Sequence, residues 1–186
     1  MKSASLLLAV ALFAGCSTTL VRETPEPVRV ADGVQLETTS LVEALLGFKG
    51  TCVQAANGAC KDQVFSAQCV LKGDGETFKA VFLAPQLRLL TITLTKPHTI
   101  TYERAPQVPR AFEPEYALAD LAYVNLDADT LRRAVAPTLS VEDDGTTRRI
   151  KSGDTLVADL VRRPNGDVDF RNVRYGYSYT LRTVTP

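Results

Sequence analysis

The sequence predicts an α+β protein in which antiparallel strands outnumber a few short helices. Two observations predict the strands. Apolar and polar residues alternate with period two in several stretches, which is the pattern of strands with one buried face. Pairs of turn-forming residues that include glycine separate these stretches. A third observation predicts that the helices are few, because apolar residues recur at helical spacing only in short segments.

The N-terminus has the pattern of a secretion signal. Lys2 precedes an apolar stretch at residues 4–14, which is much shorter than the about 20 residues that a membrane span needs. The stretch ends in the segment Leu12-Phe13-Ala14-Gly15-Cys16, which resembles a lipobox except that Phe13 replaces the usual Leu, Val or Ile. We therefore expect residues 1–15 to be removed and the thiol of Cys16 to take up lipid. The alternative is an ordinary signal peptide with a chance cysteine.

The residue after the lipid-bearing cysteine predicts whether the protein lies at the inner or the outer membrane. Ser17 follows Cys16, and an Asp in its place would resemble the signal that retains lipoproteins at the inner membrane. We therefore expect the protein in the inner leaflet of the outer membrane, facing the periplasm. Residues 16–35 are rich in polar residues and proline, which predicts a lipidated N-terminus and a flexible tether. Residues 36–186 then form a single β-rich domain.

Composition excludes one large class of partner. The formal net charge of the chain is zero, and no basic face is evident, so we expect no nucleic-acid partner. An apolar content of 45% is enough for a real core.

Three cysteines remain besides Cys16. Cys52, Cys60 and Cys69 are an odd number for an oxidising compartment, so one disulfide and one free thiol are expected. Cys52–Cys60 is favoured over Cys52–Cys69 as the pair. A metal site made of the three cysteines is the alternative, but there is no CxxC motif and the one histidine is distant. No metal site is therefore predicted.

The N-terminal half begins with a helix and continues as strands. Ser40 and Glu43 form a capping box, which predicts a helix over 41–48. Asn57-Gly58 is a turn signal, expected to join a strand near 49–56 to a long strand near 62–72. Two more strands follow, at 78–84 and at 87–96. In the second of these, alternate threonines indicate a β-strand.

The C-terminal half begins with two helices. The segment 115–124 is apolar nearly all round, which predicts a buried helix. Asp127 can cap a second helix. The remainder returns to strands, expected at about 138–143, 147–151, 155–162 and 167–184.

Three tyrosines share one face of the last predicted strand. Tyr175, Tyr177 and Tyr179 alternate with polar residues. One interpretation is a core face whose hydroxyls reach the surface. The other is the wall of a cavity, apolar but able to hydrogen-bond a ligand. The residues expected to line such a cavity are Tyr175, Tyr177, Tyr179, Leu90, Ile92, Leu94 and Phe82.

The order of elements resembles that of the periplasmic lipoprotein carrier and its outer-membrane receptor lipoprotein. Three segments also resemble a family of small outer-membrane lipoproteins of unknown function, often encoded beside aryl polyene biosynthesis genes. They are Gln86 to Ile92, Leu118 to Tyr123 together with the helix Leu131 to Ala134, and Asn172 to Leu181. The resemblance implies an open antiparallel β-barrel, carrier-like and covered by short helices, and it implies no reaction.

Two functions follow as hypotheses. In the first, the barrel binds or receives an apolar ligand, such as an acyl or polyene lipid or the acyl chains of a lipoprotein. In the second, the barrel is filled by its own side chains and docks onto an envelope protein complex. An enzyme is not expected, because His98 has no partner in a recognisable nucleophile motif. No cofactor is expected.

Replacing Cys16 with Ala should leave the precursor uncleaved and without lipid, because the thiol is the group that is acylated. Metabolic labelling with radioactive palmitate, followed by gel electrophoresis, measures this. Incorporation of label into the variant at the parent's level would contradict the predicted anchor.

Overall fold

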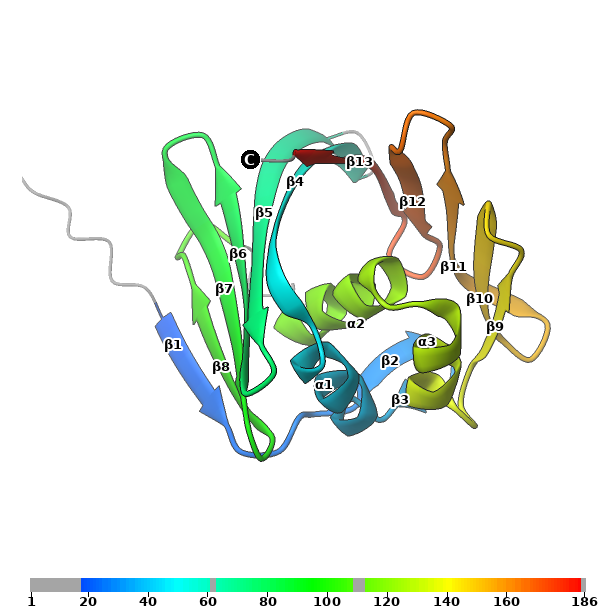
Figure 1. Ribbon diagram of the computed structural model, residues 1–186, viewed down its shortest axis with the longest axis horizontal. Coiled ribbons are helices and arrows are strands. Elements are labelled where there is room, and N and C mark those ends of the chain that lie inside the picture. Colours follow the sequence, from blue (N-terminus) through cyan, green and yellow to red (C-terminus); the bar gives the residue numbers. More distant parts are fainter. Residues whose placement is uncertain (1–17, 61–62, 109–112, 185–186) are drawn as a thin grey trace, which may run out of the picture.

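The computed structural model describes residues 18–60, 63–108 and 113–184. Its main feature is an eleven-stranded antiparallel sheet that curves around the helices (Figure 1). The strand order is β1-β8-β7-β6-β5-β4-β13-β12-β11-β10-β9, so two meanders meet where β4 pairs with β13. The sheet is not closed, since β1 and β9 are its edges. The predicted α+β class with antiparallel strands is confirmed, whereas the predicted open barrel is not shown, because the sheet does not close.

The first meander follows helix α1 and the second follows helix α3. The strands of the first are β4 (Lys49–Cys60), β5 (Gln63–Asp74), β6 (Thr77–Ala84), β7 (Leu87–Thr95) and β8 (Thr99–Arg104). The strands of the second are β9 (Ser140–Asp143), β10 (Thr147–Ser152), β11 (Thr155–Arg162), β12 (Val168–Asn172) and β13 (Tyr177–Val184).

The segment expected to be a tether is structured from residue 18 onward. It contains β1 (Thr18–Arg22), which extends the sheet beside β8, and the small hairpin of β2 (Val28–Ala31) and β3 (Val34–Leu36). Val28 and Leu36 are buried. A tether was expected because the apolar side chains of this segment are too sparse in the sequence to form a core of their own. In the structure they are buried by packing against the rest of the domain.

Two short helices cover part of the concave side. Helix α1 (Thr39–Leu46) begins two residues earlier than predicted, and its N-cap is Thr38 rather than Ser40. The Thr38 hydroxyl does not cap the helix but donates to the Glu26 carbonyl at 3.0 Å. Helix α3 (Ala128–Val135) confirms the predicted cap, since the Asp127 side chain accepts from the backbone of Thr130 at 2.9 Å.

Helix α2 (Pro114–Asn125) lies inside the curve of the sheet, where Figure 1 shows it surrounded by strands and by the other helices. Pro114 begins it, and nine of its twelve residues are buried, which confirms the predicted buried helix. None of the described helices has the length and hydropathy needed to cross a membrane.

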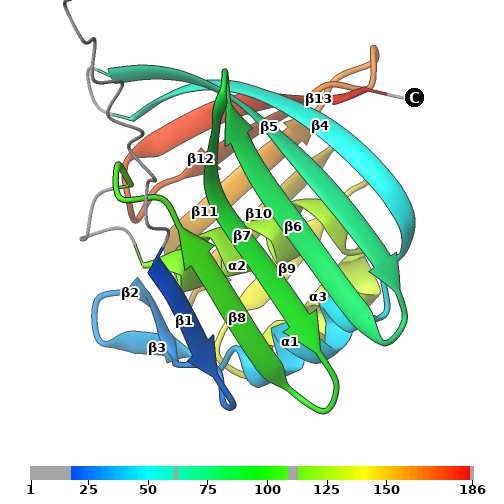
Figure 2. The same ribbon diagram turned by 90° about the vertical axis from the view of Figure 1, so that its left-hand side faces the viewer.

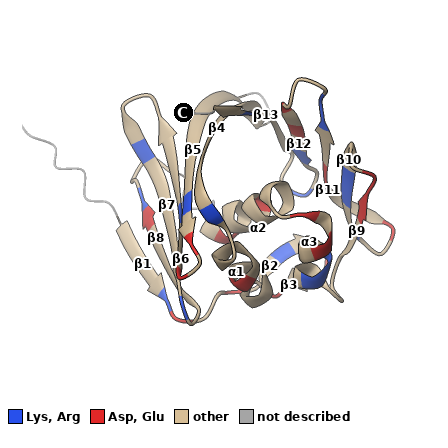
Figure 3. Cartoon of the chain, viewed as in Figure 1, with Lys and Arg blue, Asp and Glu red and all other residues tan. Residues whose placement is uncertain are grey.

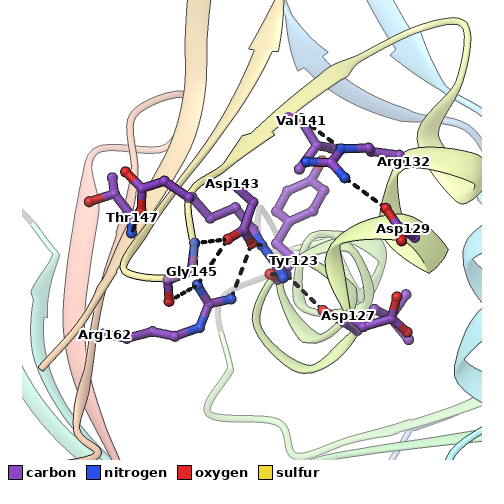
Figure 4. Close-up of polar contacts among 12 residues, drawn as sticks. Tyr123, Asp127, Asp129, Arg132, Val141, Asp143, Gly145, Thr147 and Arg162 are labelled. Carbon is purple, nitrogen blue, oxygen red and sulfur yellow. Dashed lines mark hydrogen bonds and ion pairs between the residues drawn. The ribbon is translucent and has the colours of Figure 1, made fainter. Parts of the chain in front are cut away.

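A buried arginine joins α2 to the second meander. Arg148 of β10 is 2% exposed, and its guanidinium donates to the carbonyls of Tyr123 and Leu126 at 2.6 and 2.8 Å. It also pairs with Asp143 at 2.6 Å, and Asp143 pairs in turn with Arg162 at 3.3 Å (Figure 4). These charge-assisted bonds satisfy carbonyls at the end of α2 that have no intrahelical partner.

The predicted turn at Asn57-Gly58 is wrong, because β4 continues through both residues to Cys60. In the sheet, Gly58 lies between Phe65 of β5 and Tyr179 of β13. A Cβ atom at Gly58 would overlap the Ser178 carbonyl and the Cβ of Tyr179. The glycine is therefore needed for the close approach of β13 rather than for a turn.

The strand predicted over 167–184 is also wrong in one respect, since it is two strands, β12 and β13. They are joined by a turn at residues 173–176, in which Gly176 has φ +67°. Glycine adopts this conformation without the steric cost that other residues meet. Period-two alternation continues through the turn by chance, which hid the break.

Replacing Gly58 with Ala should lower the free energy of unfolding by about 1–3 kcal/mol, the usual cost of forcing an extra methyl group into packed surroundings. Chemical denaturation measures it. Asn57→Ala is the matched control, because Asn57 is the exposed neighbour on β4 and already carries a Cβ. Equal stability of the two variants would contradict the close approach of β13.

Candidate functional site

A cavity of about 280 Å³ lies between α2 and the strands β4, β5 and β13. Its walls are aliphatic and aromatic side chains with a few polar groups. The lining residues are Gln54, Ala56, Cys60, Phe65, Ala67, Gln68, Cys69, Phe82, Ala117, Asp120, Leu121, Val124, Asn125, Tyr177, Tyr179 and Leu181. Figure 3 shows that the charged positions of β4 and β5 lie at the strand ends nearest α1, away from most of this wall.

Small side chains create the space. Ala56 of β4 pairs with Ala67 of β5, and both face the cavity beside Leu181 of β13. Ala117 occupies the facing position on α2. Two layers normally pack until few voids larger than a water molecule remain. Here, facing alanines leave the gap between the layers unfilled.

Aromatic rings form one wall of the cavity. Tyr177 stacks on Tyr179 with ring centroids 6.2 Å apart, and Tyr179 stacks on Phe170 at 4.9 Å. Phe65 meets Tyr179 edge to face at 6.5 Å across Gly58, which has no side chain to keep the rings apart. Such contacts hold ring positions, so this wall is preformed.

The structure divides the residues predicted to line a cavity into two groups. Tyr177, Tyr179 and Phe82 line the cavity. The others do not. Tyr175 lies in the turn before β13, stacks on Tyr116 at 3.9 Å and donates to the Arg29 carbonyl at 2.5 Å. The remaining three, Leu90, Ile92 and Leu94 of β7, belong to the buried core.

One carboxylate lies among the apolar residues of the wall. Asp120 of α2 is 6% exposed and accepts hydrogen bonds from the amide of Asn172, at 3.0 Å, and from the hydroxyl of Tyr177. Burial raises its pKa to about 7, although both hydrogen bonds oppose the rise. Burial and the nearby Asp120 also raise the pKa of Tyr177 well above its usual value. Asp120 was not identified as a site residue from the sequence. The one feature of the sequence that could have indicated it is an acidic residue within the apolar stretch that forms α2.

The expected disulfide is absent, since Cys52, Cys60 and Cys69 are all free. Cys52 and Cys60 lie eight residues apart on one continuous strand, which separates them by about 26 Å, whereas a disulfide needs Cα atoms about 4.4–6.8 Å apart. Cys69 faces Gln54 rather than Cys52. Burial raises the pKa of the Cys69 thiol to about 12, so this cavity residue is an unreactive apolar group.

Two predicted sites cannot be placed, because Cys16 and Ser17 lie outside the described residues. Within the described ranges there is no group of three metal-ligating side chains.

A comparison with known protein families identifies the family of this chain. Residues 51–185 match a family described as proteins of unknown function, DUF3261. The chain belongs to the DUF3261 family. The matched region of this DUF3261 protein runs from β4 to β13 and includes every residue that lines the cavity. A search of curated proteins found no match.

The buried Asp120 should make stability depend on pH. Its carboxyl keeps a proton up to about pH 7 in the folded state and releases it near its ordinary value of 3.8 when unfolded. The folded state therefore binds more protons over this range, so stability falls as pH rises toward 7. Between pH 5 and pH 8 we expect a loss of roughly 2–3 kcal/mol from this group, measured by urea unfolding.

Asp120→Asn should remove most of that loss, because an amide of the same shape has no proton to release. Asp154→Asn, in the exposed turn between β10 and β11, controls for a change of net charge. A pH dependence in Asp120→Asn as steep as the parent's would contradict the assignment.

Proposed function

We propose that this protein is a lipid-anchored, periplasm-facing protein of the outer membrane that binds an apolar ligand between its open sheet and α2. The ligand class is an acyl or polyene lipid, or the acyl chain of a lipoprotein. The observation that carries the proposal is the cavity of about 280 Å³ with aliphatic and aromatic walls. The anchor rests on the sequence around Cys16.

The size of the cavity argues for an occupant. At about 30 Å³ for each molecule of liquid water, the 280 Å³ space equals roughly nine waters. Because the cavity is partly open, water can enter it, and contact of that water with apolar walls costs free energy. Water gains little there because the walls offer few polar partners. An apolar ligand that replaces the missing packing offsets this cost.

The same volume limits the ligand. Pockets for small molecules usually measure about 300–1,000 Å³, so 280 Å³ accommodates part of one chain rather than a whole phospholipid. The stacked tyrosines provide flat faces that suit a conjugated chain as well as a saturated one. The resemblance of the sequence to a lipoprotein carrier is a further reason to propose an apolar ligand.

The proposal assigns no catalytic residue and no cofactor. Its rival is the interaction lipoprotein, in which the space holds no ligand and an outer face docks onto an envelope protein.

Filling the cavity should abolish ligand binding. Ala67→Phe places a ring in the space beside Ala56, and it should keep or raise stability because burial of a phenyl group contributes about 1.5–3 kcal/mol. Binding of a fluorescent fatty acid and urea unfolding are measured on the mature chain (residues 16–186) carrying Cys16→Ser. Mass spectrometry of an organic extract of the same protein identifies any lipid that copurifies.

Ser66→Phe is the matched control, because Ser66 is the exposed neighbour on β5 and its side chain points to the opposite face of the sheet. This control should bind the fatty acid like the parent. Absence of binding and of extracted lipid in the parent, with Ala67→Phe more stable, would favour the interaction lipoprotein. Undiminished binding by Ala67→Phe would place the ligand elsewhere.

A further inference from the structure

The start of β1, the hairpin of β4 and β5, and the start of β13 lie at the same end of the sheet. The pairing of residues between strands establishes this from the backbone alone. Thr18, at the start of β1, pairs with Arg104 of β8, and Arg104 pairs with Leu90 of β7. The ladder continues through Phe82 of β6 to Cys69 of β5. Each of these four pairings is antiparallel, so β1 and β5 run in the same direction. The first residue of β5 therefore lies toward the end of the sheet where β1 starts.

The β4–β5 hairpin extends beyond that row at this end. β5 pairs with β6 only from Gln68 onward, so residues 63–67 pair with β4 alone. β13 begins at the same end, because Tyr177 pairs with Cys60. Figure 2 shows the start of β1, the distal ends of β4 and β5 and the turn before β13 together on its left-hand side, whereas β13 ends on the right.

The predicted lipid anchor reaches this end of the sheet. Cys16 precedes Thr18 by two residues, and two residues span at most about 7 Å. No long tether separates an acyl chain on Cys16 from the folded domain, because β1 is already paired at Thr18. A lipid there would hold the start of β1 at the membrane surface.

The extended hairpin exposes two large apolar side chains. Val64 is 87% exposed and Phe65 is 36% exposed. Charged residues of β4 and β5 are confined to Lys49, Lys72 and Asp74, which lie at the other end of these strands. Lys61 and Asp62, which join the two strands, lie outside the described residues. Exposed apolar side chains on a hairpin that extends beyond the neighbouring strand are typical of a contact surface.

The cavity opens at the same end. Gln54, Cys69 and Leu181 are buried at its inner end, whereas Cys60 and Phe65 line its outer end and are exposed. Phe65 therefore belongs both to the wall of the cavity and to the exposed hairpin.

We propose that this end of the sheet rests on the bilayer that carries the anchor, with Val64 and Phe65 in contact with the acyl layer and the cavity open toward that leaflet. The ligand then enters from the membrane without crossing water. This inference rests on the proposed anchor at Cys16 and adds an orientation to it. The exposed hairpin contacts a lipid bilayer rather than a protein strand, because the proposed anchor lies at the same end of the sheet.

The chain has no tryptophan, so one introduced tryptophan reports its own surroundings. Val64→Trp and Val184→Trp are prepared in the lipidated mature protein and reconstituted in vesicles of phosphatidylethanolamine and phosphatidylglycerol. Val184 is 44% exposed and ends β13 at the opposite end of the sheet, where it pairs with Val53. Some vesicles carry lipids brominated on the acyl chains, which quench tryptophan that lies among them. Circular dichroism checks that both variants are folded.

Val64→Trp should emit at shorter wavelength in vesicles and lose most of its emission with brominated lipid, whereas Val184→Trp should change in neither respect. If the protein floats with vesicles but Val64→Trp is not quenched, or both variants are quenched alike, the orientation is wrong while the anchor stands. If the protein does not float, the anchor fails and the orientation with it. Fatty-acid binding by the Cys16→Ser chain tests the cavity separately.

Discussion

The structure depends on covering helix α2 on all sides. A helix whose residues are apolar nearly all round cannot lie at a surface, so the sheet curves around it and the other helices close the remaining sides. Polar contacts then fix its position. Arg22 of β1 pairs with the buried Glu115 near its start, Asn172 and Tyr177 hold Asp120 at its middle, and Arg148 binds the carbonyls at its end. Buried polar groups need such partners, so α2 fits in only one position.

The cavity is a consequence of that fixed position. With α2 held at both ends, it cannot move toward the alanines of β4 and β5 to fill the space beside them. Elsewhere on the sheet, larger side chains such as Phe78 and Ile92 reach the helices and leave a packed core. The same polar contact that holds the middle of α2 places a carboxyl with a pKa of about 7 in the cavity wall. A ligand bound in the cavity, as proposed, would therefore lie against a titrating group.

Some of the site could be predicted from the sequence. Period-two alternation located Tyr177, Tyr179 and Phe82 on strand faces that line the cavity. The same alternation included Leu90, which faces the core, and Tyr175, which lies in a turn. Periodicity indicates which residues share a face, but the neighbour that covers that face belongs to another part of the chain. The cysteine prediction failed for a related reason, since spacing gives no distance until it is known that β4 does not turn.

By itself, the sequence determined the fold class, the buried nature of α2, the cap of α3 and most strands of the two meanders. These features depend on local spacing of apolar residues and on caps, which a short window of sequence contains. Only the tertiary structure decided the pairing of β4 with β13, the role of Gly58, the partners of Asp120 and the existence of the cavity. These depend on contacts between residues far apart in the chain, where close approach and unfilled volume arise only once separate elements have packed together.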